Sequence, residues 1–263
     1  MDLREAVAAG SFYPGKKAEL ERQLRALFSK APESEKSNCV VAPHAGYEYS
    51  GRVSACSFKA LEKNPTFILL GPNHTGLGEG ISVSGSDYWE TPLGKLAVDK
   101  ALRESLLASL GIEADDVAHY QEHSLEVELP FIQALFGKPK ILPITIMQHD
   151  FSGLERLGNA IASLKGKFSV VASGDFTHHE PLESARKKDM QAIEAIKGLD
   201  AKGFHSMVLS RRLSICGLSP VTAAMCCCRA LGKKAGKLLL YDTSAASTGD
   251  SSSVVGYASI AFY

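Results

Sequence analysis

The stretch VAPHAGYEYSG, residues 41–51, holds the pattern that decides the fold: an apolar run, a turn at Pro43, and then His44 among glycine and tyrosine. Residues 67–76, FILLGPNHTG, repeat this order and bring in His74. Short runs of Val, Ile and Leu are typical of strands buried on both faces of a sheet. In open α/β sheets, ligands bind beyond the carboxyl ends of the strands. We therefore predict that these strands run parallel and that their exit loops present both histidines to one cleft.

Apolar runs of this kind alternate with helical patterns along the chain. The expected strands cover residues 38–42, 67–71, 141–146, 169–172, 237–242 and 254–262. The expected helices cover residues 17–29, 99–110, 124–136, 153–164, 181–196, 201–209 and 220–231. Residues 90–97 are expected to form a hairpin or loop insertion, and residues 243–254 a loop of small residues. This alternation predicts a single α/β domain over residues 1–263, with a central mixed β-sheet flanked by helices on both faces.

Composition and charge exclude several classes of protein. The chain has 263 residues, of which 45% are hydrophobic, and Lys plus Arg number 29, as do Asp plus Glu. Without a basic excess, we expect neither nucleic acid nor a membrane surface as a general partner. The N-terminus is charged, unlike a secretory signal, and no apolar run approaches the roughly 18 residues of a membrane span. We therefore expect a cytoplasmic protein whose cysteines are reduced thiols.

Two further strands end on chemically active residues. Residues 169–180, SVVASGDFTHHE, deliver Asp175, His178 and His179, and residues 141–150, ILPITIMQHD, end near Gln148 and His149. A single histidine at a strand end is more often structural than functional. Several exits of the same kind favour a shared site that includes His44, His74, Asp175 and His178.

The histidines of this site point to a metal ion. Imidazoles on separate strands are natural ligands of divalent metals, because each is neutral at pH 7 and offers one lone pair. Two histidines plus one anionic ligand form the non-haem iron(II) arrangement. The anion could be Asp175, Glu122 or a thiolate.

The best candidate thiolate is Cys216, in the stretch RLSICGLSPV. Ser219 is interpreted as the N-cap of the next helix and Pro220 as its first residue. Cys216 then lies just ahead of a helix N-terminus, whose positive end favours a thiolate. The alternative is a small apolar side chain in a turn. The cysteines at 226, 227 and 228 point about 100° apart on a helix and are interpreted as core residues.

The stretch HYQEHSLEVELPF, residues 119–131, leaves two interpretations open. Glu122 and His123 either form a solvated helix end, or they reach the cleft as acid/base groups or as support for the ligands. His149 and His205 are interpreted as structural.

Seven motifs in this sequence occur in the same order as in the Memo family, and the chain is identified as a member of it. They are AGSFYPG, PHAGYEYSG, LGPNH, EHSLEVELPF, SGDFTHH, ICGLSP and DSSSVVGYAS. The family resembles the class III extradiol ring-cleaving dioxygenases in fold, which implies the same single α/β domain here.

The resemblance also implies roles for individual residues. The metal ligands would be His44, His74 and Cys216. Asp175 and His178 would lie close by, with His178 as acid/base, and Glu122 and His123 would line the same cleft. The dioxygenases have a carboxylate as third ligand, and a thiolate in its place shifts the preference towards copper(I) or zinc while leaving iron(II) possible. This difference argues against ring cleavage.

The function implied is a metal-dependent redox enzyme, with iron(II) expected first and copper second, that acts on an unknown small-molecule substrate or peptide. Radical-SAM and AMMECR-type proteins are possible partners, because prokaryotic relatives lie beside them. One alternative is a non-catalytic module that binds a peptide or partner in a cleft rimmed by Tyr47, Tyr49 and Trp89. Another is a hydrolase or acyl transferase in which Cys216 attacks and His178 is its base. The pair His44 and His74 favours the metal, because a hydrolase has no evident use for it.

Overall fold

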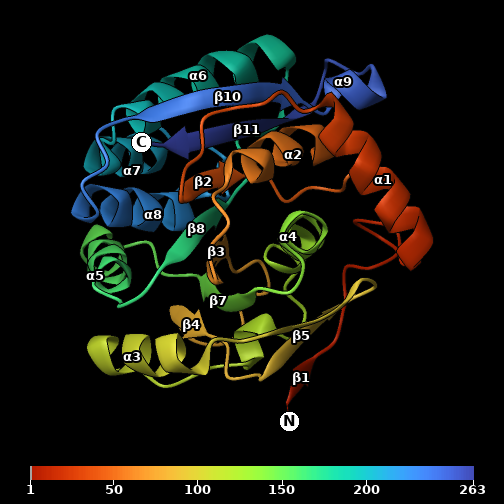
Figure 1. Ribbon diagram of the computed structural model, residues 1–263. Helices are drawn as coiled ribbons and strands as arrows, with labels where there is room; N and C mark the ends of the chain where they lie inside the picture. Colours follow the sequence, from red (N-terminus) through yellow and green to blue (C-terminus); the bar gives the residue numbers. More distant parts are fainter. Residues whose placement is uncertain (1) are drawn as a thin grey trace.

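A central mixed β-sheet organises the molecule (Figure 1). The computed structural model describes residues 2–263. Within them the sheet has eight strands: β2 (Cys39–Ala42), β3 (Thr66–Pro72), β4 (Ile81–Val83), β7 (Lys140–Ile146), β8 (Phe168–Ser173), β9 (His178–Glu180), β10 (Gly236–Thr243) and β11 (Val254–Phe262). Their spatial order is β10–β11–β2–β8–β3–β7–β4, and β9 pairs with β11. All six strands expected from the sequence are therefore present.

The middle of the sheet is parallel and its edges are antiparallel. Strands β2, β8, β3 and β7 pair in parallel. Towards the edges the pairs are antiparallel: β11 with β2, β10 with β11, and β4 with β7. The predicted parallel arrangement of β2 and β3 is confirmed, with β8 between them. The loop that leaves β8 therefore emerges between the loops that carry His44 and His74.

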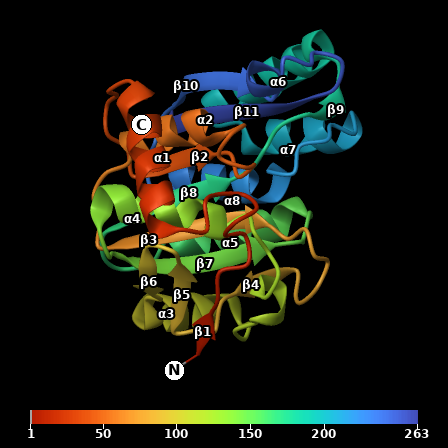
Figure 2. The same ribbon diagram turned by 90° about the vertical axis from the view of Figure 1, so that its right-hand side faces the viewer.

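Helices cover both faces of the sheet, as predicted (Figures 1 and 2). One face carries α5 (Phe151–Ala162), α6 (Leu182–Lys197), α7 (Ala201–Ser210) and α8 (Leu218–Ala230). The other carries α1 (Lys17–Lys30), α2 (Gly51–Ala60) and α4 (Leu129–Phe136). Every residue of β2, β3 and β8 is buried between these layers, which explains their continuous apolar runs.

A smaller sheet lies beside the central one. It consists of β1 (Leu3–Arg4), which runs parallel to β5 (Tyr88–Thr91), and β6 (Gly94–Ala97), which pairs with β5 in the expected hairpin. Helix α3 (Lys100–Leu110) follows, and the side chain of Asp99 caps its N-terminus by accepting a hydrogen bond from the Leu102 N–H.

Several predicted boundaries were wrong for identifiable reasons. The helix expected over residues 124–136 is a 3-10 turn, η2 (Glu126–Glu128), followed by α4. Helix α2 was not predicted, because it is buried on nearly every side and lacks a polar stripe. Residues 243–254 include a short helix, α9 (Ala245–Thr248). The N-cap of α8 is Gly217, not Ser219, whose hydroxyl donates instead to the Gln148 carbonyl at 2.8 Å.

No helix within residues 2–263 combines the length and the apolar character that crossing a membrane requires.

Candidate metal centre

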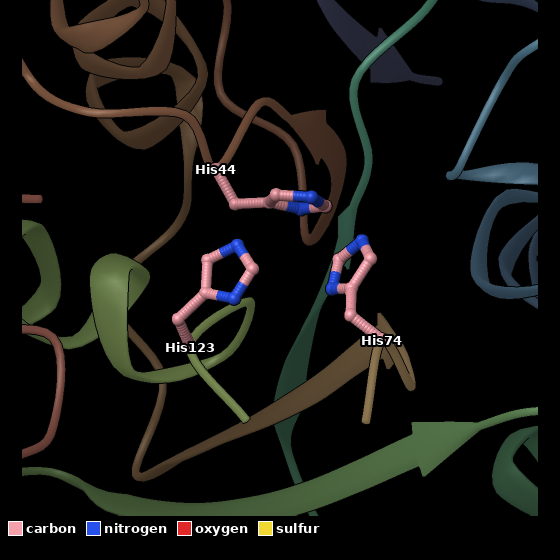
Figure 3. A group of neighbouring side chains, drawn as sticks. All are labelled: His44, His74 and His123. Carbon is pink, nitrogen blue, oxygen red and sulfur yellow. The ribbon is translucent and has the colours of Figure 1, made fainter. Parts of the chain in front are cut away.

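Three imidazoles converge at the carboxyl end of the parallel strands (Figure 3). His44 follows β2, His74 follows β3, and His123 comes from the loop between the 3-10 turns η1 (Val117–His119) and η2. One ring nitrogen from each lies within 4.8 Å of the other two. The ring centroids are 5.2 Å apart for His44 and His74 and 4.8 Å apart for His74 and His123. The sequence predicted His44 and His74 together, and the family resemblance placed His123 in the same cleft. The third predicted ligand, Cys216, does not belong to this group of three.

His44 is buried and held on two sides. Its backbone N–H donates to Asp175 Oδ1 at 3.0 Å, and its ring Nδ1 lies 2.8 Å from Ser173 Oγ. Because Nδ1 is engaged, Nε2 is the nitrogen left to bind a ligand, and it lies 3.4 Å from Cys216 Sγ. Burial, together with the neighbouring His123 and His74, lowers the pKa of His44 well below its usual range, so the ring is neutral.

Glu122 lies beneath His74 and His123 and not in the cleft. Its Oε1 is 2.9 Å from His74 Nδ1 and 3.3 Å from His123 Nδ1, and its Oε2 accepts the His74 backbone N–H at 2.5 Å. Burial raises the pKa of Glu122, but hydrogen bonds from His74 and the Ser124 N–H outweigh it and lower the pKa to about 2. An ionised carboxylate that holds Nδ1 leaves Nε2 of His74 free, as carboxylates that hydrogen-bond to metal-binding histidines do.

His123 is fixed by an aromatic neighbour from the N-terminal segment. The Phe12 ring stacks on it, with centroids 4.3 Å apart. Burial lowers the pKa of His123 to about 4 despite the opposing effect of Glu122. The ring is therefore neutral and can act as a ligand or as a hydrogen-bond partner. The solvated-helix-end interpretation of Glu122 and His123 was wrong, because one is fully buried and the other is mostly so.

Cys216 and Asp175 form a second group around His44. Together with His44 they offer one ligand atom each, within 4.8 Å of one another. Cys216 Sγ accepts the Asp175 backbone N–H at 3.2 Å, and Asp175 Oδ2 lies 3.9 Å from His44 Nε2. Burial and the neighbouring Asp175 raise the pKa of the Cys216 thiol well above its usual range. The start of helix α8 alone does not produce a thiolate, contrary to the interpretation of the sequence.

His178 lines the cleft but belongs to neither ligand group. Its ring Nδ1 lies 2.7 Å from the Ser214 carbonyl, which can only accept, so Nδ1 carries the proton and Nε2 is basic. The same residue donates its backbone N–H to the Ser214 hydroxyl at 2.9 Å. The Ser214 carbonyl therefore orients this imidazole. Burial raises the pKa of Asp175 to about 6, against the opposing effect of His178.

The cleft above these groups has a volume of about 660 Å³. Its walls combine the aromatic rings of Phe12, Tyr49 and Tyr257 with three hydroxyl side chains from the segment 244–253. Tyr47 and Trp89 were expected at its rim, but both are buried elsewhere. Of the three aromatic residues expected at the rim, only Tyr49 lines the cleft.

The remaining candidates lie outside the cleft. His149 Nδ1 contacts Ser219 Oγ at 2.7 Å, and His205 Nε2 contacts the His149 carbonyl at 2.6 Å, so both rings are tied to local structure. The three cysteines of α8 are buried in the core.

An α/β domain whose parallel strands end in imidazole and carboxylate groups, beside a thiol from the loop before α8, defines a protein with a potential metal site at the strand ends. Comparison with known proteins gives its family. The Memo-like protein family matches residues 4–261, and the chain belongs to this family.

Similar proteins occur in archaea and bacteria. A MEMO1 family protein of Methanosarcina barkeri is 41% identical over 264 residues, which cover 98% of this chain and 99% of the relative. Its counterpart in Methanopyrus kandleri is 38% identical over 278 residues and 98% of each chain. In Aquifex aeolicus, a MEMO1 family protein is 37% identical over the whole of both chains.

Proposed function

We propose that the chain is a metal-dependent redox enzyme with a cleft like that of the non-haem dioxygenases, and that His44, His74 and Cys216 hold its ion. The observation that carries the proposal is the distance of 3.4 Å between His44 Nε2 and Cys216 Sγ. Two ligands of one tetrahedral ion, with nitrogen at about 2.1 Å and sulfur at about 2.3 Å, lie about 3.6 Å apart. The two side chains are therefore spaced as a nitrogen and a sulfur ligand of one ion would be.

A second observation that supports the proposal is the hydrogen bonding of the two imidazoles, which leaves one nitrogen of each ring available to a metal ion. Ser173 and Glu122 engage Nδ1 of His44 and His74, which leaves Nε2 as the available nitrogen in each ring. Imidazole with thiolate suits iron(II), copper and zinc, and the redox function favours iron(II) first and copper second. When bound, such an ion would supply Lewis acidity and one-electron chemistry.

The protein's own contribution would be positioning and proton transfer. His178 Nε2 is the basic nitrogen of a side chain that lines the cleft without joining a ligand group. It is suited to take a proton from a bound substrate and to return it. The aromatic and hydroxyl walls of the cleft suit a small molecule with both apolar and hydrogen-bonding parts.

The hydrolase alternative loses support from the state of the thiol. A cysteine nucleophile must be a thiolate near neutral pH. The Cys216 pKa is instead raised by burial, and the nearest imidazole nitrogen to its sulfur belongs to His44.

The protein partners proposed for this chain rest on its resemblance to the Memo family alone. Association with radical-SAM or AMMECR-type proteins stays a prediction, which co-purification of the tagged chain with such proteins would test.

Metal binding is the decisive test. Protein purified without oxygen or chelator and reconstituted with iron(II) or copper is expected to hold about one ion per chain. His44→Ala should lose most of this binding, because His44 is the residue that both potential ligand groups share. His149→Ala, which removes an imidazole outside the cleft, is the control and should bind like wild type. Equal metal content in His44→Ala and wild type, measured by elemental analysis, would mean that the site is misassigned.

Alkylation of Cys216 separates the metal enzyme from the hydrolase. In metal-free protein, the raised pKa keeps the thiol protonated near pH 7, so alkylation should be slow there and should speed up as the pH rises towards that pKa. Bound ion should protect Cys216 at every pH. Peptide mapping after limited alkylation measures both effects. Fast labelling near pH 7 that metal fails to prevent would favour the hydrolase.

A further inference from the structure

A fully buried acid, Glu128, lies on the side of His44 that faces away from the cleft. It belongs to η2, and its Oε1 lies 2.8 Å from Ser173 Oγ. Among residues 2–263, its Oε2 has no hydrogen-bond partner. A buried carboxylate with a bare oxygen is costly, whereas a neutral acid with a bare carbonyl oxygen is much less so. The position of Glu128 therefore requires an explanation that the cleft chemistry does not supply.

The hydroxyl of Ser173 is the hub of this arrangement. Three polar atoms surround its oxygen at 2.8 Å: His44 Nδ1, the Ser124 carbonyl oxygen and Glu128 Oε1. The hydroxyl carries one hydrogen and can accept two hydrogen bonds. The Ser124 carbonyl can only accept, so it takes the hydroxyl hydrogen. The other two contacts are satisfied only if His44 Nδ1–H and a protonated Glu128 both donate to Ser173.

No other assignment of hydrogens satisfies all three contacts. If Glu128 were ionised, Ser173 could donate to it or to the Ser124 carbonyl, and the remaining pair of oxygens would face each other at 2.8 Å with no hydrogen between them. If His44 carried its proton on Nε2, Ser173 would have to donate to Nδ1, and the Ser124 carbonyl would be left without a donor.

We propose that Glu128 is held as a neutral acid and is a positioning residue, which acts through Ser173 to fix the His44 tautomer that carries hydrogen on Nδ1 and a lone pair on Nε2. That lone pair faces Cys216 Sγ. Burial, reinforced by Asp175 and opposed by the Ser173 hydrogen bond, raises the pKa of Glu128 well above its usual range, in agreement with the hydrogen-bond count. The neutral acid and the tautomer need no ion, so they stand independently of the proposed function. Only the expected effect on metal affinity rests on it.

Two spectroscopic measurements on metal-free protein test the proposal directly. The infrared spectrum of wild type at pH 7 should contain a protonated-carboxyl band that Glu128→Gln removes. Nitrogen NMR of protein labelled at histidine, with His44 assigned through His44→Ala, should show hydrogen on Nδ1. The absence of a band that depends on Glu128, or hydrogen on Nε2 of His44, would overturn the proposal.

The variants test the link between the residues. Ser173→Ala should release the tautomer into a mixture and weaken cobalt(II) binding about 10- to 100-fold, the usual cost of losing the hydrogen-bond partner of a metal-binding histidine. Glu128→Leu should act in the same direction, whereas Glu128→Gln, which can still donate a hydrogen to Ser173, should preserve the tautomer. Ser169→Ala is the matched control, since Ser169 is a buried serine on the same strand that bonds to the Glu62 carbonyl instead.

The outcomes separate the two proposals. An unchanged His44 tautomer in Ser173→Ala would refute the positioning role, even if Glu128→Leu fails to fold. A wild-type protein that binds no metal but shows the acid band and the tautomer would refute the proposed function and leave this inference standing.

Discussion

Replacing Arg4 by Met is expected to lower the free energy of unfolding by about 3–5 kcal/mol, because it leaves a buried carboxylate without its counter-charge. Arg4 and Glu126 form an ion pair whose side chains are 4% and 0% exposed. The guanidinium also lies 4.6 Å over the Trp89 ring. Methionine keeps the apolar stem of the side chain and removes the guanidinium, with its charge, its hydrogen bonds and its contact with the Trp89 ring. Urea denaturation followed by circular dichroism measures the loss.

An exposed ion pair provides the control. Lys16→Met breaks a pair with Glu19 whose side chains are 82% and 47% exposed, and it should leave stability nearly unchanged, because solvent-exposed pairs contribute little. If Arg4→Met loses no more stability than Lys16→Met, the buried ion pair contributes no more to the free energy of unfolding than an exposed one.

The same residue reaches the candidate site through the backbone. Arg4 donates to the His119 carbonyl at 3.1 Å and to the Glu122 carbonyl at 2.5 Å, so it holds both ends of the loop before His123. Glu126 in turn accepts the Val7 and Ala8 N–H groups at 2.8 and 2.9 Å. The pair thus fastens the N-terminal segment, including Phe12, to the loop that carries His123.

This fastening also explains what the sequence could reveal and what it could not. His44 and His74 were predictable because each follows an apolar run directly, and the direction of a buried strand fixes where its exit loop emerges. His123 follows no strand. The motif EHSLEVELPF placed it in the cleft only through the family resemblance. Its position in the fold depends on the Arg4–Glu126 ion pair and on the Phe12 ring, more than a hundred residues earlier, and no local pattern records such contacts.

The buried acids of η2 illustrate a second limit. The helical pattern over residues 124–136 predicted a continuous helix, and the 3-10 turn within it turns Glu126 towards Arg4 and brings Glu128 to Ser173. A charged residue is ordinarily predicted to be exposed, so its burial cannot be predicted from the sequence until its partners are known. For Cys216, its position before a helix suggested a lowered pKa and a thiolate. Burial raises the pKa instead, and burial depends on the tertiary structure, which the local sequence does not show.

His178→Ala should retain bound metal and lose turnover by about 10²–10⁴-fold, the usual contribution of a general acid or base. The geometry gives the reason: Nδ1 is tied to the Ser214 carbonyl at 2.7 Å, so Nε2 is held as a base, while neither potential ligand group contains this residue. The assays are metal content by elemental analysis and turnover of the first substrate found by screening iron- or copper-loaded protein.

The neighbouring histidine supplies a matched control for this variant. His179 also lines the cleft, and its backbone has a positive φ of 59°, so His179→Asn removes the imidazole while keeping a residue that tolerates this conformation. It should retain most of the turnover. Loss of metal in His178→Ala would make His178 a ligand and overturn its assigned role. Retained metal with full turnover would move the proton transfer to another group. Asp175 would then be the next residue to replace. Burial raises its pKa to about 6, and a carboxyl with that pKa can exchange a proton near neutral pH.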